Sequence, residues 1–205
     1  MTNKSIALIF GSFNPPTIAH VKMYDAVKEF DADLDICYVF SNKKYYMGYK
    51  LSKSYTSMDI RMHLLSGAVA KPSLYSTVEK DINPEGKTYL TVEYFKKHYR
   101  DVYICLGEDN LNDLHNWFNA ENLVKENKFL IFTRGNGGYE LPDFCKEYES
   151  NFTFIDFPYT DISSTKIREA YLNGQLDSVK DDIPNNVYKY LKTHDGLFKE
   201  GTIYV

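Results

Sequence analysis

Short apolar segments rich in β-branched residues alternate with amphipathic segments along most of the chain. Strands are predicted at 5–10, 34–40, 74–79, 102–106, 128–133 and 152–156, and helices at 18–30, 57–71, 88–98, 120–126 and 141–149. Two strands joined by a helical crossover form a parallel pair, and the helix covers one face of the sheet. This order therefore predicts an α/β fold with a doubly wound parallel sheet.

The segment after the last predicted strand is expected to be helical. One helix is predicted at 164–173, where Gly174 ends it, and another begins at Pro184 and continues to about residue 192. At 205 residues the chain is short enough for one hydrophobic core. We therefore expect a single domain over 1–205, with a sheet core over 1–160 and a C-terminal helical part over 161–205.

The charge and the cysteines restrict the classes of ligand and compartment. A net charge of −4 disfavours binding to a nucleic acid polymer and makes a small anionic ligand the better fit. The odd number of cysteines, without a CxxC pair, predicts buried reduced thiols at Cys37, Cys105 and Cys145. No apolar run reaches the roughly 18 residues of a membrane helix, and the first residues lack the pattern of a signal peptide. We expect a cytoplasmic protein without a membrane partner.

Two predicted strands end in unusual sequences. The first strand runs into "GSFNPP" and the fourth into "LGEDNL". In an open α/β sheet the ligand binds outside the carboxyl ends of the strands, where the strand order reverses. In a sheet ordered 3-2-1-4-5, strands one and four are the neighbours at that point. We therefore expect the functional site between these two strand ends.

The turn after the first strand combines a flexible glycine with a histidine in the next helix. Gly11 lets the backbone approach a ligand closely, and Pro15 and Pro16 stiffen the loop. His20 falls in the first helical turn, where free N–H groups and the helix dipole attract anions. This arrangement favours a phosphate site. The alternative is a structural one, because a Gly–Pro turn needs no function and a lone helical histidine is more often structural.

A second group of polar residues begins the helix predicted at 164–173. Ser163, Ser164 and Thr165 place three hydroxyls at its N-terminus, and Arg168 follows on the same face. A capping box would place Glu or Gln three residues after the cap, whereas Lys166, Ile167 and Arg168 stand there. The pattern suits a phosphate held by hydroxyls and a guanidinium, with simple N-capping as the alternative.

A third group follows the fourth strand. Gly107 allows close approach, Asp109 offers two acceptors to a ribose diol, and Trp117 could stack on a planar ring. The alternative is an acidic helix start with a core tryptophan. Arg134, after the fifth strand, could stack on a base or lie on the surface. The segment 41–57 has no clear period and is either a mobile loop over the site or an ordinary surface loop.

Taken together, "GSFNPPTIAH", "GEDNLNDLHNW" and "ISSTKIREA" resemble the nucleotidyltransferase superfamily with (H/T)xGH and ISSTxxR motifs. Within it they are most similar to the nicotinate- and nicotinamide-mononucleotide adenylyltransferases, over Ile6 to about Tyr190. The resemblance implies a Rossmann-like fold and a cytoplasmic enzyme of NAD biosynthesis. It would transfer AMP from ATP, with Mg²⁺, to a pyridine mononucleotide and release pyrophosphate, forming deamido-NAD or NAD.

The resemblance also implies roles for individual residues. His20 and Arg168 would be catalytic. The residues that would bind ATP are Gly11, Ser12, Phe13, Thr17, His20, Gly107, Asp109, Arg134, Ser163, Ser164, Thr165 and Arg168. Those that would bind the mononucleotide are Phe13, Asn14, Lys44, Thr91 and Trp117.

This chain departs from the family pattern at several positions. Thr17 stands where many members have the first histidine, and Ala19 replaces the usual glycine. Lys43 or Lys44 matches the family lysine, without the surrounding Pro-x-His-Lys pattern. Thr91 lies in "YLTVEYF", which is similar to the family segment Ser-Tyr-Thr-Val-Asp-Thr-Leu.

The sequence contains no recognisable nucleophilic triad, Walker loop, GxGxxG motif or metal-binding Cys/His spacing. The implied reaction needs none of them, because the attacking group is already an anionic phosphate and charge neutralisation supplies the rate. Two other functions stay open: pantetheine-phosphate adenylyltransferase and a non-catalytic nucleotide-binding sensor. The preference for nicotinate or nicotinamide mononucleotide and the assembly into a homo-oligomer are also open.

Overall fold

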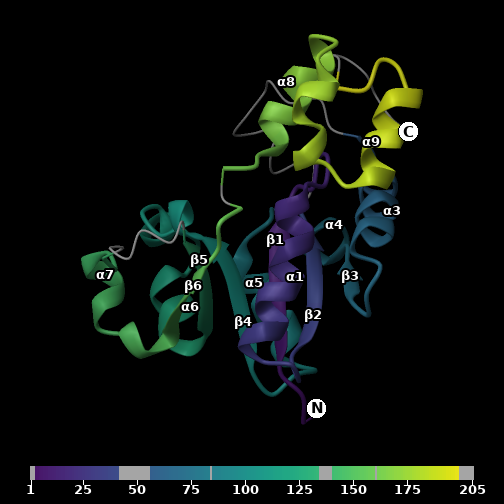
Figure 1. Ribbon diagram of the computed structural model, residues 1–205. Helices are drawn as coiled ribbons and strands as arrows, with labels where there is room; N and C mark the ends of the chain where they lie inside the picture. Colours follow the sequence, from purple (N-terminus) through teal and green to yellow (C-terminus); the bar gives the residue numbers. More distant parts are fainter. Residues whose placement is uncertain (1–2, 42–55, 84, 134–139, 160, 199–205) are drawn as a thin grey trace.

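The computed structural model describes residues 3–41, 56–83, 85–133, 140–159 and 161–198. Within them, parallel strands form one six-stranded sheet in the order β3-β2-β1-β4-β5-β6 (Figure 1). The strands are β1 Ile6–Gly11, β2 Asp35–Phe40, β3 Leu74–Ser76, β4 Val102–Gly107, β5 Lys128–Thr133 and β6 Phe152–Asp156. The predicted order 3-2-1-4-5 with a further strand and the Rossmann-like α/β class are confirmed.

Helices connect the strands and continue after the last one. The α-helices are α1 Ile18–Phe30, α3 Met58–Val69, α4 Val78–Asp81, α5 Thr88–Lys96, α6 Ala120–Glu126, α7 Asp143–Lys146, α8 Ser164–Leu172 and α9 Asn185–Thr193. The short 3-10 helices are η1 Glu108–Asn110, η2 Leu114–Asn116, η3 Glu149–Asn151 and η4 Leu176–Asp182. The predicted helices after strands one, two and four therefore form.

Two predicted elements differ from the structure by more than two residues at an end. The strand predicted at 74–79 ends at Ser76, because the Ser76 hydroxyl accepts a hydrogen bond from the Val78 N–H at 3.2 Å and the chain turns into α4. The helix predicted at 141–149 is reduced to α7 and η3. Leu141 and Cys145 are buried in the sheet core. Their spacing of four residues accounts for the helical period of the sequence, although only a short helix forms there.

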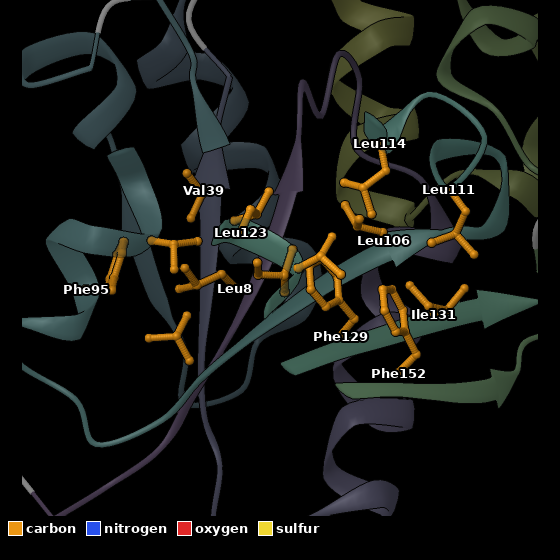
Figure 2. Packing of buried hydrophobic residues seen from close by; sticks show 14 of the residues in the cluster. Leu8, Val39, Phe95, Leu106, Leu111, Leu114, Leu123, Phe129, Ile131 and Phe152 are labelled. Atoms are coloured by element: carbon orange, nitrogen blue, oxygen red, sulfur yellow. The ribbon is translucent and has the colours of Figure 1, made fainter. Parts of the chain in front are cut away.

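Both faces of the sheet are covered. Ile6 and Leu8 face α4, α5 and α6, in the core drawn in Figure 2. Ala7 and Ile9 face the other way, toward α1 and α3. Successive side chains of a strand point to opposite faces, so a strand buried on both faces is apolar throughout. The continuous apolar segments of the sequence have this origin.

The C-terminal helices form a third cluster at the end of the sheet where β1 stops (Figure 1). Ile167 of α8 and Val187 of α9 pack with Leu64 of α3. The next residue of α3, Leu65, packs on the sheet side. Helix α3 therefore joins the C-terminal helices to the sheet.

The three cysteines are buried and free, as predicted. Burial raises the pKa of the Cys37 thiol to about 12, so this side chain behaves as a small apolar group. Among the described residues no helix is both long and apolar enough to cross a membrane.

Candidate functional site

The two sequence motifs begin at neighbouring strand ends. Strands β1 and β4 pair in parallel as far as Ile9 and Cys105, and each continues to a terminal glycine, Gly11 and Gly107. Strand β2 lies on the other side of β1, so the strand order reverses between β1 and β4. This is the position at which open α/β sheets bind their ligands.

The loop after β1 is built around a buried phenylalanine. Phe13 is 0% exposed, has φ of 47°, and its ring meets the His20 ring edge-on with centroids 4.9 Å apart. A Cβ at Gly11 would lie 2.6 Å from Cε1 of Phe13. Gly11 therefore makes room for this ring, and only the backbone of Phe13 remains to face a ligand.

Thr17 and His20 form a capping box at the start of α1. Thr17 is the N-cap, its N–H donates to His20 Nδ1 at 2.9 Å, and the His20 N–H donates to the Thr17 hydroxyl at 3.4 Å. Thr17 is 0% exposed, so in this structure it orients His20. Sequence reasoning missed this pair, although Thr-x-x-His has the spacing of a capping box.

His20 is a neutral hydrogen-bond donor in this arrangement. Because a backbone N–H can only donate, Nδ1 accepts and the ring proton is assigned to Nε2. Burial lowers the pKa of His20 to about 4, since desolvation disfavours the charged imidazolium. At neutral pH the side chain can donate a hydrogen bond from Nε2 to an anion, and it lacks the second ring proton that an imidazolium would need to act as a general acid.

Helix α8 reaches across to the loop after β1. Ser164 Oγ donates to the Pro15 carbonyl at 2.8 Å, and Arg168 Nη1 donates to the Asn14 carbonyl at 2.7 Å. Arg168 Nη2 also donates to Thr165 Oγ1 at 3.0 Å. Ser163 is the N-cap and accepts from the Lys166 N–H at 3.2 Å, so the capping alternative holds for this hydroxyl.

The site residues after β4 lie on a more exposed segment. A Cβ at Gly107 would lie 2.6 Å from Asp109 Oδ1, so the carboxylate folds over this glycine. Asp109 is exposed at η1, and Trp117, just after η2, is partly buried against the sheet core. The segment is therefore placed beside the loop after β1 by the pairing of β1 with β4.

Two predicted mononucleotide-binding side chains have protein partners. Asn14 is 0% exposed, and its Oδ1 accepts from the Thr56 N–H at 3.3 Å and from the Thr56 hydroxyl at 3.0 Å. Thr91 is also 0% exposed and accepts from Asn83 Nδ2 at 3.0 Å. Lys43, Lys44 and Arg134 lie outside the described residues, as does most of the segment 41–57.

A buried arginine that carried no sequence motif also lies at this end of the sheet. Arg61 of α3 is 1% exposed and donates from Nη1 to the Ser12 carbonyl at 2.5 Å. Its signal in the sequence was weak: a cation within the largely apolar segment "MDIRMHLLSGAV". In the described part of the chain, no group of three or more His, Cys, Asp or Glu side chains is arranged to hold a metal ion.

Comparisons with known proteins find relatives along the whole chain. A protein of Clostridium tetani named "Probable nicotinate-nucleotide adenylyltransferase" is 28% identical over 206 residues, which cover 96% of this chain and 100% of the relative. A protein of Caldicellulosiruptor bescii with the same name is 27% identical and covers 95% of this chain and 98% of the relative. The sequence similarity therefore extends over almost the full length of this chain and of each relative.

Solved structures share the fold. The nicotinic acid mononucleotide adenylyltransferase of Plasmodium falciparum, complexed with NaAD, superposes with a TM-score of 0.71 and 20% identity, over 93% of this chain and 96% of that one. The cytidylyltransferase-like family profile matches residues 8–170, from β1 through most of α8, and includes the candidate site residues after β1, after β4 and at the start of α8. Because the match spans well over half of the sequence, the chain belongs to the cytidylyltransferase-like family.

Proposed function

We propose that this protein is an adenylyltransferase that transfers AMP from ATP to nicotinate mononucleotide or nicotinamide mononucleotide. The observation that carries the proposal is the neutral His20 donor beside the loop after β1. Ser164 and Arg168 of α8 bind the backbone of the same loop directly. The full-length likeness to proteins named nicotinate-nucleotide adenylyltransferase supports the choice of substrate.

The reaction is an in-line displacement at the α-phosphorus of ATP. A phosphate oxygen of the mononucleotide forms the new bond to this phosphorus, and the bond to the bridging oxygen of the β-phosphate breaks. Pyrophosphate leaves, and the product is deamido-NAD or NAD. Because the nucleophile is already an anion, the protein needs to position the phosphates and neutralise developing charge.

In this proposal His20 Nε2 donates to an ATP phosphate oxygen, and Thr17 keeps its ring in place. The backbone of Gly11, Ser12 and Phe13 approaches the phosphates. Arg168 supplies positive charge beside the phosphates, held in place by its bonds to Asn14 and Thr165. The hydroxyls of Ser163, Ser164 and Thr165 stand at the same helix end, where an anion is favoured.

The segment after β4 would bind the sugar and the pyridine ring. Gly107 and Asp109 would hold the ATP ribose, and the partly buried Trp117 would stack on the pyridine of the mononucleotide. We also propose Arg134 near adenine, and Asn14, Lys44 and Thr91 near the mononucleotide. Since Asn14 and Thr91 are bonded to protein side chains, they would act by shaping the site or after a rearrangement.

We propose Mg²⁺ as the divalent ion that accompanies ATP. Mg²⁺ commonly binds through substrate phosphates, water and one or two carboxylates. The described residues offer Asp109 near the site and no ready-made cluster of ligands, a donor set that suits an ion carried by the nucleotide. When bound, it would neutralise phosphate charge.

The proposal extends to the organisation and location of the chain. We propose that residues 1–205 act as a single domain, with a core over 1–160 and a C-terminal part over 161–205, because α3 packs both on the sheet and on the C-terminal helices. We also propose a cytoplasmic enzyme of NAD biosynthesis, since its three free, buried thiols suit a reducing compartment.

A direct assay tests this function. Purified protein is mixed with ATP, Mg²⁺ and, separately, nicotinate mononucleotide, nicotinamide mononucleotide or phosphopantetheine, and both pyrophosphate and the dinucleotide product are measured. We expect pyrophosphate release and dinucleotide formation with a pyridine mononucleotide. Pyrophosphate release only in the mixture with phosphopantetheine would identify the protein as a pantetheine-phosphate adenylyltransferase. ATP binding without pyrophosphate release in any mixture would indicate a nucleotide sensor.

A further inference from the structure

Arg61 connects three separate parts of the chain beneath the proposed phosphate site. Its Nη1 donates to the Ser12 carbonyl at 2.5 Å and to the Ser41 carbonyl at 3.5 Å, and its Nε donates to the Thr56 carbonyl at 3.3 Å. Ser12 follows β1, Ser41 follows β2, and Thr56 lies just before α3. One guanidinium therefore fixes the ends of two strands relative to the start of a helix.

The burial of this charge is not explained by packing alone. Arg61 is 1% exposed, and a guanidinium stays protonated at any ordinary pH. Burying a charge costs free energy, and apolar side chains of similar volume often replace buried ions without loss of stability. An apolar residue would therefore be sufficient to pack α3 on the sheet.

The contact with Ser12 controls the orientation of a peptide group. The carbonyl of Ser12 and the N–H of Phe13 belong to one planar peptide unit and point in opposite directions. Because Arg61 holds the carbonyl, the Phe13 N–H is directed away from Arg61. Phe13 has φ of 47°, a conformation that costs a non-glycine residue about 1–3 kcal/mol and requires surrounding contacts to maintain it.

We propose that Arg61 is a positioning residue for nucleotide binding. It fixes the Ser12–Phe13 peptide group so that the Phe13 N–H donates to a phosphate of the bound nucleotide. Arg168 and Ser164 hold the carbonyls of Asn14 and Pro15 in the same loop, so Arg61 completes a set of three anchors. This inference rests on the proposed function, because it assigns the anchored N–H to ATP.

The test compares Arg61→Met with Leu65→Ala in the same helix. Leu65 is 0% exposed and packs in the sheet core, so its truncation destabilises α3 without removing an anchor of the loop. For Arg61→Met we expect an ATP dissociation constant raised about tenfold and kcat lowered about 10- to 100-fold. This is less than the roughly 100- to 1,000-fold lost when a preorganised donor is removed outright, because the Phe13 N–H is misoriented but still present. Leu65→Ala should lower the melting temperature and change either constant by less than about twofold.

Hydrogen–deuterium exchange supplies a local readout that does not depend on activity. Each variant is measured the same number of degrees below its own melting temperature. Peptides that contain residues 11–17 should then exchange faster in Arg61→Met than in Leu65→Ala. Equal exchange in the two variants, or unchanged ATP binding and kcat in Arg61→Met, would overturn the proposal.

Arg61→Lys decides the question if the methionine variant does not fold. Lysine keeps the charge but lacks the planar fork that reaches Ser12 and Thr56 together. An intermediate loss of ATP affinity at a wild-type melting temperature supports the proposal, and wild-type affinity and exchange refute it. Failure of the proposed function is seen separately, as wild-type protein that binds no ATP, and exchange at residues 11–17 then still tests the anchor.

Discussion

The loop after β1 and the segment after β4 lie side by side but are held in different ways. The carbonyls of Ser12 and Asn14 accept from arginines 49 and 154 residues further along the chain. After β4, Asn110 Nδ2 donates within its own turn to the Gly107 carbonyl at 3.3 Å and to Asp109 Oδ1 at 3.0 Å, and the buried Leu111 and Leu114 pack in the sheet core. The first half of the candidate site is therefore held by hydrogen bonds from distant arginines to its backbone, and the second by apolar packing on the sheet core together with its own turn.

This difference has a functional consequence. If ATP phosphates bind at the loop after β1, substitution of His20, Arg61 or Arg168 should impair catalysis strongly, because each removes a support of the same loop. Substitutions after β4 should act on the single substrate that their side chain contacts. The following variants test this contrast.

The largest effect is expected for His20→Ala. It removes both the Nε2 donor and the Nδ1 acceptor of the Thr17 N–H. Loss of a preorganised donor typically costs about 3 kcal/mol, so kcat should fall roughly 100-fold or more in a steady-state pyrophosphate assay. Near-normal turnover would make His20 a structural residue only.

His20→Gln is the matched control for the capping role. Glutamine at this position can accept from the N-cap N–H as in a standard capping box. We expect its melting temperature to stay near that of the wild type and its turnover to remain low. A fully active His20→Gln variant would show that capping alone accounts for the histidine.

A smaller loss is expected for Arg168→Lys. The charge remains, but a lysine cannot donate to the Asn14 carbonyl and Thr165 Oγ1 with one planar group and still face a phosphate. We expect kcat/KM for ATP to fall by about tenfold or more, corresponding to at least ~1.4 kcal/mol. Arg100→Lys, an exposed arginine paired with Asp101, serves as the control, and equal kinetics for the two variants would contradict the role of Arg168.

Trp117→Ala tests the segment after β4. If the indole stacks on the pyridine, mononucleotide binding should weaken by about 1–3 kcal/mol, the range for base–aromatic stacking, with ATP binding nearly unchanged. Trp117→Phe should retain most of the affinity. Since Trp117 also packs against the core, its truncation will lower the melting temperature. A large drop in melting temperature with equal losses for both substrates would refute the stacking role.

The smallest effect concerns pH. The folded pKa of His20, about 4, lies below the ordinary value of 6.5, so between these values the unfolded chain binds a proton that the folded chain does not. The stability linked to neutral His20 is present above pH 6.5 and is lost as the pH falls toward 4. Urea unfolding midpoints should therefore decline more steeply over this window in the wild type than in His20→Gln, and parallel curves would contradict the lowered pKa.

The sequence by itself determined the architecture. Alternating apolar strands and amphipathic helices predict a parallel sheet covered on both faces, and the structure confirms it. The positions of "GSFNPP" and "LGEDNL" placed the candidate site at the ends of β1 and β4, and the structure brings these two segments to neighbouring strands. Helices α1 and α6 and strands β5 and β6 have the predicted bounds, because their periodicity matches the faces that they bury. Local patterns were sufficient wherever burial followed a regular period.

Only the tertiary structure decided how the site is held. Arg61 carried no motif, yet it binds the Ser12 carbonyl, and the buried Asn14 binds Thr56 across 42 residues. The hydrogen bond from Arg168 to the Asn14 carbonyl likewise depends on the position of α8 relative to the sheet. The arginines in these contacts bind backbone carbonyls of residues far away in the sequence. Because every residue has a backbone carbonyl, the side-chain pattern of the sequence does not show which carbonyl is bound.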